Sequence, residues 1–569
     1  MNSSKLTFFY SFFLLIISLL VGLNSTDFFT GEQYGYWYFN KIFINNFLYP
    51  DISRSPIYII YLSLFNWLST PFNFYAEAIV SNFLLSISLF FLFKRDYNNF
   101  YIFLIIAMSV GFFFNIIPYP QALALSLLNF AILLRKQNKT LLFLLSYLLI
   151  ILAIYCRITY MIVFILFIFF DLLKELLKYK NTSKFDYKKN SAIFLTILFF
   201  FLTNNIFNSN KSQSKFNNGY FQSLEWKPSK SKSNIDIAFQ VNFNFLYYEK
   251  NKNKILENKK DFFFVNKIAF DGADTLFESL KSNPKFVIWG IIKNSSHLAP
   301  IILNKFSSRN YLPSCSGIGH SCYSNYFYIS FVFILFVLFN YYFFFKKKYE
   351  NDFDIKCYSL INYALVFSTI LAMPKIRYMT PFIFFLVPFN MYLISMFTNK
   401  LKNKNIKIIL SLFIIFSFSY NNYTSKYLID YFSIKKTQNN INSIKNYHHD
   451  FLKLNSKIAN CNSLLTSDPT LFLANNKIDE DSVYSLADLP PFGKYTDDQG
   501  LKIYKNISIN CLLLNTDMQS VGGANRGTGT DFEIRRKNYL FPFLKSNKKN
   551  IVDKINYRFF GDLYVFSEK

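Results

Sequence analysis

The chain has 569 residues, of which 52% are hydrophobic and 21% aromatic, and its formal net charge is +27. The apolar residues come in repeated runs, the longer of which match the roughly 20 residues needed to cross a bilayer. This pattern excludes a soluble protein with several separate cores. The basic residues lie mostly in short loops between these runs, where they set orientation and meet anionic lipids, so we exclude nucleic acid as a partner.

Leu6–Leu23 is the first apolar run and follows Lys5. It is long, no small-residue cleavage site follows it and more runs come after it, so we expect an uncleaved first helix rather than a signal peptide. Further spans are expected near Phe72–Phe93, Phe100–Ile117, Gln121–Leu134, Leu141–Tyr155, Ile158–Leu173, Ala192–Phe207, Tyr326–Phe345, Cys357–Met373, Pro381–Phe397 and Ile406–Tyr420. The predicted fold class is mainly α, a polytopic helical membrane protein of about eleven spans.

Basic clusters recur in alternate short loops, among them Lys94–Arg95, Arg135–Lys139 and Lys174–Lys189, whereas the opposite set of loops is sparse in Lys and Arg. Cytoplasmic loops carry the excess of positive charge, so the N-terminus is expected in the cytoplasm. An odd number of spans then places the C-terminus outside the cell. The expected location is the plasma membrane, the inner membrane of a bacterium, with membrane lipids as surrounding partners.

Residues 1–423 are expected to form the transmembrane domain, with outer loops at 24–71 and 208–325. Within the first outer loop, Ile57–Leu68 is apolar but short and flanked by prolines, which indicates a helix lying at the interface rather than a span. Residues 424–569 are expected to form a small extracytoplasmic α/β domain. Strand-like runs at Ser463–Thr466, Ser508–Leu514 and Asp562–Phe566, separated by turn residues, carry that prediction.

Four of the six cysteines fall on the side that the charge rule calls external, where disulfides persist. Cys315 and Cys322 lie seven residues apart in the second outer loop, and Cys461 and Cys511 each lie beside a strand candidate. We predict the disulfides Cys315–Cys322 and Cys461–Cys511. The alternative is that these cysteines are small buried residues.

The stretch Asn24–Pro56, between the first two spans, contains several acidic residues close to the apolar part of the membrane. A carboxylate at a bilayer surface is costly to hold unless it has a role or a partner. Held at a lipid–water boundary it can have a raised pKa, which suits a general base acting on an acceptor hydroxyl. Glu32 is the first candidate, Asp27 is the reserve candidate and Asp51 is interpreted as scaffold. Glu32 could equally help to hold a divalent cation, or be a solvated loop acid.

Glu32 is followed by the aromatic stretch Tyr34–Tyr38, then by Pro50, by Ser55–Tyr58 and by the next span. This order resembles the first external loop of the GT-C membrane glycosyltransferases, especially bacterial protein O-mannosyltransferases and lipid A aminoarabinose transferases. The resemblance implies that Glu32 is the catalytic base or a metal-site residue and that Tyr34 helps to bind substrate. Many relatives have paired acids here, whereas Gly31 precedes Glu32, so the need for a divalent cation stays open.

Two later segments carry the same resemblance. Ala153–Tyr160 resembles the family's span pair joined by a basic residue, and Lys375–Pro381 resembles the Arg-Tyr-x-x-Pro that opens a late span. A polyprenyl-phosphate sugar donor leaves its phosphate at the membrane surface, where Arg offers a bidentate fork. We expect this role for Arg377 with Lys375 beside it, then for Arg157 and Arg54. Simple snorkelling of these side chains to the interface is the alternative.

These features predict a glycosyltransferase, specifically a hexosyltransferase, that moves a sugar from a polyprenyl-phosphate carrier to an extracytoplasmic glycan, lipid or protein. One alternative is a polysaccharide polymerase or ligase, which tends to rely on arginines in outer loops rather than on an acid in the first loop. A lipid or solute transporter is the other alternative. The large outer C-terminal domain and the absence of a visible internal repeat in the sequence argue against a transporter.

Overall fold

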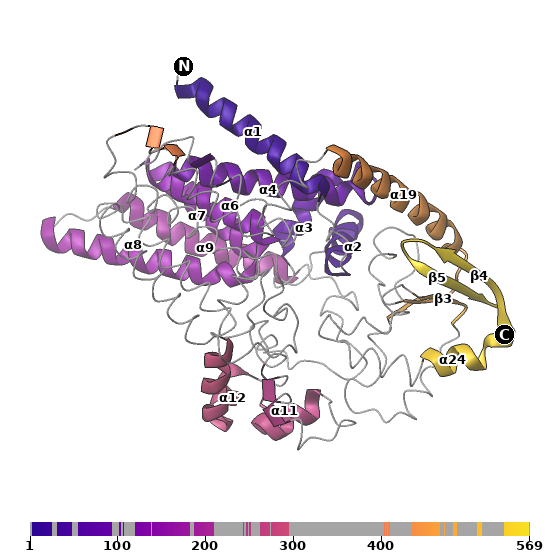
Figure 1. Cartoon of the computed structure of the whole chain (residues 1–569). Helices are drawn as coiled ribbons and strands as arrows, with labels where there is room; N and C mark the ends of the chain where they lie inside the picture. The colour runs from indigo at the N-terminus through magenta and orange to yellow at the C-terminus, as the bar shows by residue number, and fades with distance from the viewer. Residues whose placement is uncertain are drawn as a thin grey trace.

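The structure is a computed structural model that describes residues 3–24, 31–47, 55–93, 120–137, 139–182, 187–209, 262–273, 275–294, 434–466, 482–485, 509–514 and 540–567, with isolated positions between 102 and 106, 243 and 251, 403 and 409, and at 472. Helices dominate these residues, and a small five-stranded sheet lies near the C-terminus (Figure 1). This confirms the mainly α class with a small α/β part.

The N-terminal half is a bundle in which α1 packs on α4, α4 on α6, α6 on α7, and α7 on α8 and α9 (Figure 1). The bounds of these helices are α1 Ser3–Asn24, α4 Phe72–Phe93, α6 Pro120–Arg135, α7 Thr140–Cys156, α8 Met161–Thr182 and α9 Tyr187–Ser209. Six of the predicted apolar runs therefore lie on helices, because each run places enough apolar residues in sequence to bury a helical face. Their buried residues form one continuous hydrophobic core.

Two described helices, α4 and the stretch Tyr187–Phe207 of α9, are long and apolar enough to cross a membrane. The apolar segments of α1, α6 and α7 are shorter. The predicted spans from Tyr326 to Tyr420 lie outside the described residues apart from isolated positions, as does most of Phe100–Ile117. The number of eleven spans therefore stays a prediction.

Helix α8 is longer than the sequence predicted. A 3-10 turn, Ile158–Tyr160, precedes it, and the helix then continues past Leu173 to Thr182. The predicted loop Lys174–Lys189 is thus partly helical. The reason is that leucines recur at helical spacing among the lysines, as at Leu172 and Leu176, and both of these side chains are exposed.

The first outer loop is also largely helical. It contains α2 (Gly31–Asn46), α3 (Pro56–Leu62) and the 3-10 turn η2 (Ser63–Phe65). Helix α3 confirms the short helix predicted after Pro56, a residue suited to the first helical turn. Helix α2 was not predicted, since its aromatic residues have modest helix propensity and its helical state depends on tertiary packing. The Asn40 amide ties the two helices by donating to Ile59 O (2.7 Å) and Ser63 Oγ (2.8 Å).

The C-terminal part begins with the long helix α19 (Ile434–Ile458) and continues into a mixed sheet. The strand order is β2-β1-β3-β5-β4, with β1 parallel to β2 and β3, and β5 antiparallel to β3 and β4. The strands are β1 Leu464–Thr466, β2 Val483–Ser485, β3 Cys511–Leu514, β4 Ile551–Tyr557 and β5 Gly561–Phe566, and the short helix α24 spans Phe541–Ser546. The three predicted strand runs correspond to β1, β3 and β5.

Strands β2 and β4 were not predicted. Both lie at the edges of the sheet. Most side chains of β4 are exposed, and its sequence IVDKINY mixes charged and apolar residues without a strict alternation. An edge strand needs no continuous apolar pattern, so only its pairing with β5 reveals it.

Helix α19 joins the sheet to the helical bundle. It contacts α1, and it runs from the region of α1 and α4 toward the sheet (Figure 1). His448 Nδ1 lies 2.5 Å from Thr70 O, and Ile444 packs with Tyr75 and Ala78 at the start of α4. Helix α19 of the C-terminal part therefore contacts the start of α4 directly.

The Cys461–Cys511 disulfide is present, with a Cα–Cα distance of 5.8 Å, which confirms that pairing. Cys315 and Cys322 lie outside the described residues. The bond joins the end of α19 to the first residue of β3 across 50 residues.

Replacing both Cys461 and Cys511 by Ser is expected to lower the unfolding free energy of the C-terminal part by about 4 kcal/mol, because the disulfide closes a long loop in the unfolded chain. Thermal unfolding followed by intrinsic fluorescence measures this. Reductant should destabilise the wild-type protein more than the doubly substituted protein. Equal melting of the wild type with and without reductant would contradict the prediction.

Candidate functional site

A short helix, α3, lies at the centre of the candidate site. It contacts α2 on one side and α7 on another, and it is placed between α2 and the helical bundle (Figure 1). Pro56 starts this helix, and four of its side chains are buried: Pro56, Tyr58, Ile59 and Leu62. Helix α3 therefore connects the first outer segment to the end of a bundle helix.

A buried carboxylate lies beside α3. Glu77, on α4, is only 2% exposed. Ser81 Oγ donates to Glu77 Oε1 at 2.7 Å and lies 3.1 Å from the Tyr61 hydroxyl. The Tyr58 hydroxyl forms a second hydrogen bond with Glu77. Hydroxyls of α3 and α4 thus supply the hydrogen bonds that a carboxylate removed from water requires.

Tyr58 extends this network to α2. The pKa of Tyr58 is raised well above its usual value, mainly by burial and in addition by the negative charge of Glu77. The Tyr58 hydroxyl therefore keeps its proton and can donate it in a hydrogen bond. The rings of Tyr36 and Tyr58 pack edge to face, with their centroids 5.2 Å apart. Next to Tyr36, Trp37 packs against Phe74 of α4 at 5.4 Å. The position of α2 therefore depends on aromatic contacts with α3 and α4.

The end of α7 completes the site. Arg157 caps α7 with an extended backbone, and its N–H donates to Ala153 O at 2.9 Å. The preceding residue, Cys156, is buried and lies near Tyr61. Tyr160 lies near Arg157 and has a buried hydroxyl with no hydrogen-bond partner in the described part of the chain. Arg157 is thus the neighbour in sequence of a buried residue that lies near Tyr61.

The residues predicted from the sequence are placed as follows. Glu32 and Tyr34 lie in the first turn of α2, and nothing is described of their side chains. Arg157 lies at the end of α7. The remaining predicted residues fall outside the described ranges: Asp27, Arg54, Lys375 and Arg377. Helix α2, which carries Glu32, and helix α7, which Arg157 directly follows, therefore both contact α3.

Glu77 was not singled out from the sequence, although a signal was available. It is the only charged residue in the apolar stretch Phe72–Phe93. An ionisable residue inside a membrane-length apolar run is by default a functional candidate. As for metals, the described ranges contain no group of three or more His, Cys, Asp or Glu residues suited to hold an ion.

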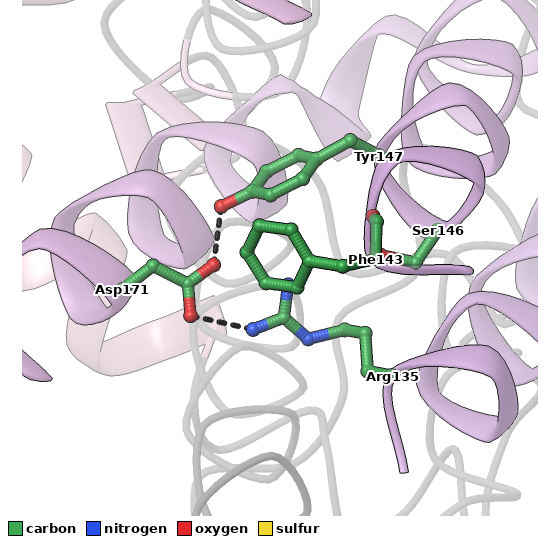
Figure 2. Close-up of polar contacts among 5 residues, drawn as sticks. All are labelled: Arg135, Phe143, Ser146, Tyr147 and Asp171. Atoms are coloured by element: carbon green, nitrogen blue, oxygen red, sulfur yellow. Dashed lines mark hydrogen bonds and ion pairs between the residues drawn. The ribbon is translucent and has the colours of Figure 1, made fainter. Parts of the chain in front are cut away.

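A second buried polar cluster lies at the other end of α7 (Figure 2). Arg135 Nη2 contacts Asp171 Oδ1 at 2.5 Å, and the Tyr147 hydroxyl donates to Asp171 Oδ2. The Arg135 guanidinium also lies 4.8 Å from the ring centroids of Phe143 and Phe167. These contacts join α6, α7 and α8. Tyr147 lies ten residues before Arg157, about 15 Å along the helix, so we interpret the cluster as scaffold.

Comparison with known proteins found no matching family model and no matching curated protein.

Proposed function

We propose that this protein is a membrane glycosyltransferase that moves a sugar from a polyprenyl-phosphate carrier to an acceptor hydroxyl outside the cell. The observation that carries the proposal is the contact of α3 with both α2 and α7. This contact supports the proposal because Glu32 lies on α2 and Arg157 directly follows α7. An acid for the acceptor and a cation for the phosphate are the two groups that such a transfer requires.

In the proposed reaction, Glu32 takes the proton of the acceptor hydroxyl as its oxygen attacks the anomeric carbon of the sugar. The bond between that carbon and the phosphate oxygen breaks, and polyprenyl phosphate leaves with the electron pair. Attack from the face opposite the phosphate inverts the configuration at the anomeric carbon. Arg157 stabilises the negative charge on the departing phosphate, together with Arg377, Lys375 and Arg54 where these reach it.

The membrane setting rests on further observations. Two helices, α4 and α9, are of membrane length. In addition, α8 and α9 expose large apolar side chains, including Ile165, Phe169, Phe194 and Phe201. Extended exposed apolar surface on a folded protein marks a place where lipid or a partner covers it. A lipid-linked donor would reach the α2–α3–α7 region from such a surface. We therefore place the protein in the plasma membrane, with the site on the outer side.

Replacing Arg157 by Ala is expected to lower kcat for transfer by about 100-fold, because the leaving phosphate loses a fixed charge-assisted hydrogen bond. The measurement is release of polyprenyl phosphate from a labelled polyprenyl-phosphate hexose by the purified protein in lipid vesicles. Arg558→Ala, at the exposed turn after β4, is the matched control and should keep the wild-type rate. Wild-type transfer by the Arg157 variant would contradict the assigned role.

A further inference from the structure

Glu77 has no role in the proposed reaction, yet the protein holds its carboxylate almost completely away from water. A buried carboxylate is costly unless hydrogen bonds replace its contacts with water. The groups that Glu77 binds therefore indicate its role. Its partners among the described residues are protein hydroxyls, those of Ser81 and Tyr58.

The link from Glu77 to α2 has two steps. The Tyr58 hydroxyl bonds to Glu77, which holds the Tyr58 ring in one orientation. The Tyr58 ring then packs against Tyr36 of α2. Asn40, one helical turn further along, bonds to Ile59 O and Ser63 Oγ. Helix α2 thus contacts α3 through two residues one turn apart, Tyr36 and Asn40.

The geometry of α2 extends this restraint to Glu32. Glu32 lies four residues before Tyr36, which is about one turn of an α-helix, or roughly 6 Å along its axis. Over so short a distance, the place of the Tyr36 backbone determines the place of the Glu32 backbone. A change in the orientation of Tyr58 would therefore move the first turn of α2.

We propose that Glu77 is a positioning residue: through its hydrogen bond with Tyr58 it fixes the first turn of α2, which carries Glu32, against α3. This inference rests on the proposed function for its catalytic consequence. Its structural content, that the Glu77–Tyr58 bond holds α2 in place, stands independently of that function. Glu77 itself is too buried to touch a substrate and acts only through Tyr58 and Tyr36.

The test compares three variants in the full-length protein in lipid vesicles. Glu77→Gln keeps an oxygen that accepts from Tyr58, Glu77→Leu removes the acceptor at similar size, and Tyr58→Phe removes the donor. We expect Glu77→Gln to transfer sugar at close to the wild-type rate. The other two variants should lose about 10- to 100-fold in kcat with little change in KM for the lipid-linked donor, since a small misplacement of a catalytic group has this effect.

Two further readouts separate positioning from general stability. The variant carrying both Glu77→Leu and Tyr58→Phe should be no slower than the slower single variant, because both substitutions break the same contact. Hydrogen exchange of the α2 amides from Tyr36 to Asn46 should rise in the Leu and Phe variants and not in the Gln variant. The exchange readout does not depend on activity.

Three results would overturn the inference. A loss in Glu77→Gln as large as in Glu77→Leu would show that the charge itself is needed. A lower folded yield with an unchanged kcat for the folded fraction would show a purely structural role. Unchanged exchange of α2 in Glu77→Leu would show that the bond does not hold α2. If the wild type transfers no sugar from the donor, the proposed function fails, and the exchange readout still decides whether Glu77 positions α2.

Discussion

Replacing Asp171 by Ala is expected to lower the free energy of unfolding by about 3–5 kcal/mol, because it leaves the Arg135 guanidinium buried without its carboxylate partner. The side chains of Arg135 and Asp171 are only 3% and 6% exposed, so water cannot replace the lost ion pair without opening the bundle. The Tyr147 hydroxyl would lose its acceptor as well (Figure 2). Denaturant unfolding of the purified protein measures the loss.

The matched control removes both charges together. A protein with Arg135→Met and Asp171→Leu should be more stable than the Asp171→Ala variant, since both members of the buried ion pair are removed together. Sugar transfer by this double variant should be unchanged, because the cluster lies at the end of α7 away from Arg157. Equal stability of the Asp171→Ala variant and the wild type would contradict the prediction. So would a double variant no more stable than the single one.

Glu32→Gln is expected to lower kcat for sugar transfer by at least about 100-fold while the protein still inserts and folds normally. The amide cannot accept the proton of the acceptor hydroxyl, and general-base catalysis typically contributes 10²–10⁴-fold. Single-turnover transfer from a labelled polyprenyl-phosphate hexose isolates this step. The KM for the donor should change little, because Glu32 is proposed to act on the acceptor.

Asp27→Asn and Asp51→Asn are the matched controls for Glu32→Gln, since both remove a carboxylate from the same outer segment. Neither should reduce transfer if Glu32 is the base. Full transfer by Glu32→Gln with loss in Asp27→Asn would assign the base to Asp27 instead. Loss of chain extension in the arginine variants while Glu32→Gln stays active would favour a polysaccharide polymerase or ligase.

The helices of the bundle could be predicted because their signal is local. The apolar run Phe72–Phe93 has the same bounds as α4, and the runs at Gln121–Leu134 and Leu141–Tyr155 each differ from their helix by one residue at either end. Apolarity over a membrane-length stretch needs no knowledge of neighbouring segments. The Cys461–Cys511 pairing was predicted from two strand candidates and a shared compartment.

The site was predicted only in part. The catalytic and phosphate-binding roles of Glu32 and Arg157 stay predictions; Glu32 lies on α2, Arg157 directly follows α7, and both helices contact α3. Glu77 was missed, because a lone acid in an apolar run does not reveal its partners. The helical state of α2 was missed for a related reason: its buried aromatic residues pack against distant segments. Trp37 packs on Phe74 of α4, and Tyr38 and Phe39 pack with Ile59 of α3 and Val483 of β2.

The sequence by itself determined the mainly helical class, the places of the bundle helices and the three inner strands, because these follow from the local order of apolar and turn residues. The tertiary structure alone decided that α3 joins α2 to α7, that Tyr58 and Ser81 bind Glu77, and that Arg135 pairs with Asp171 across 36 residues. Such contacts join residues far apart in the chain. Their existence depends on how helices pack, and no local pattern of residue types encodes that packing.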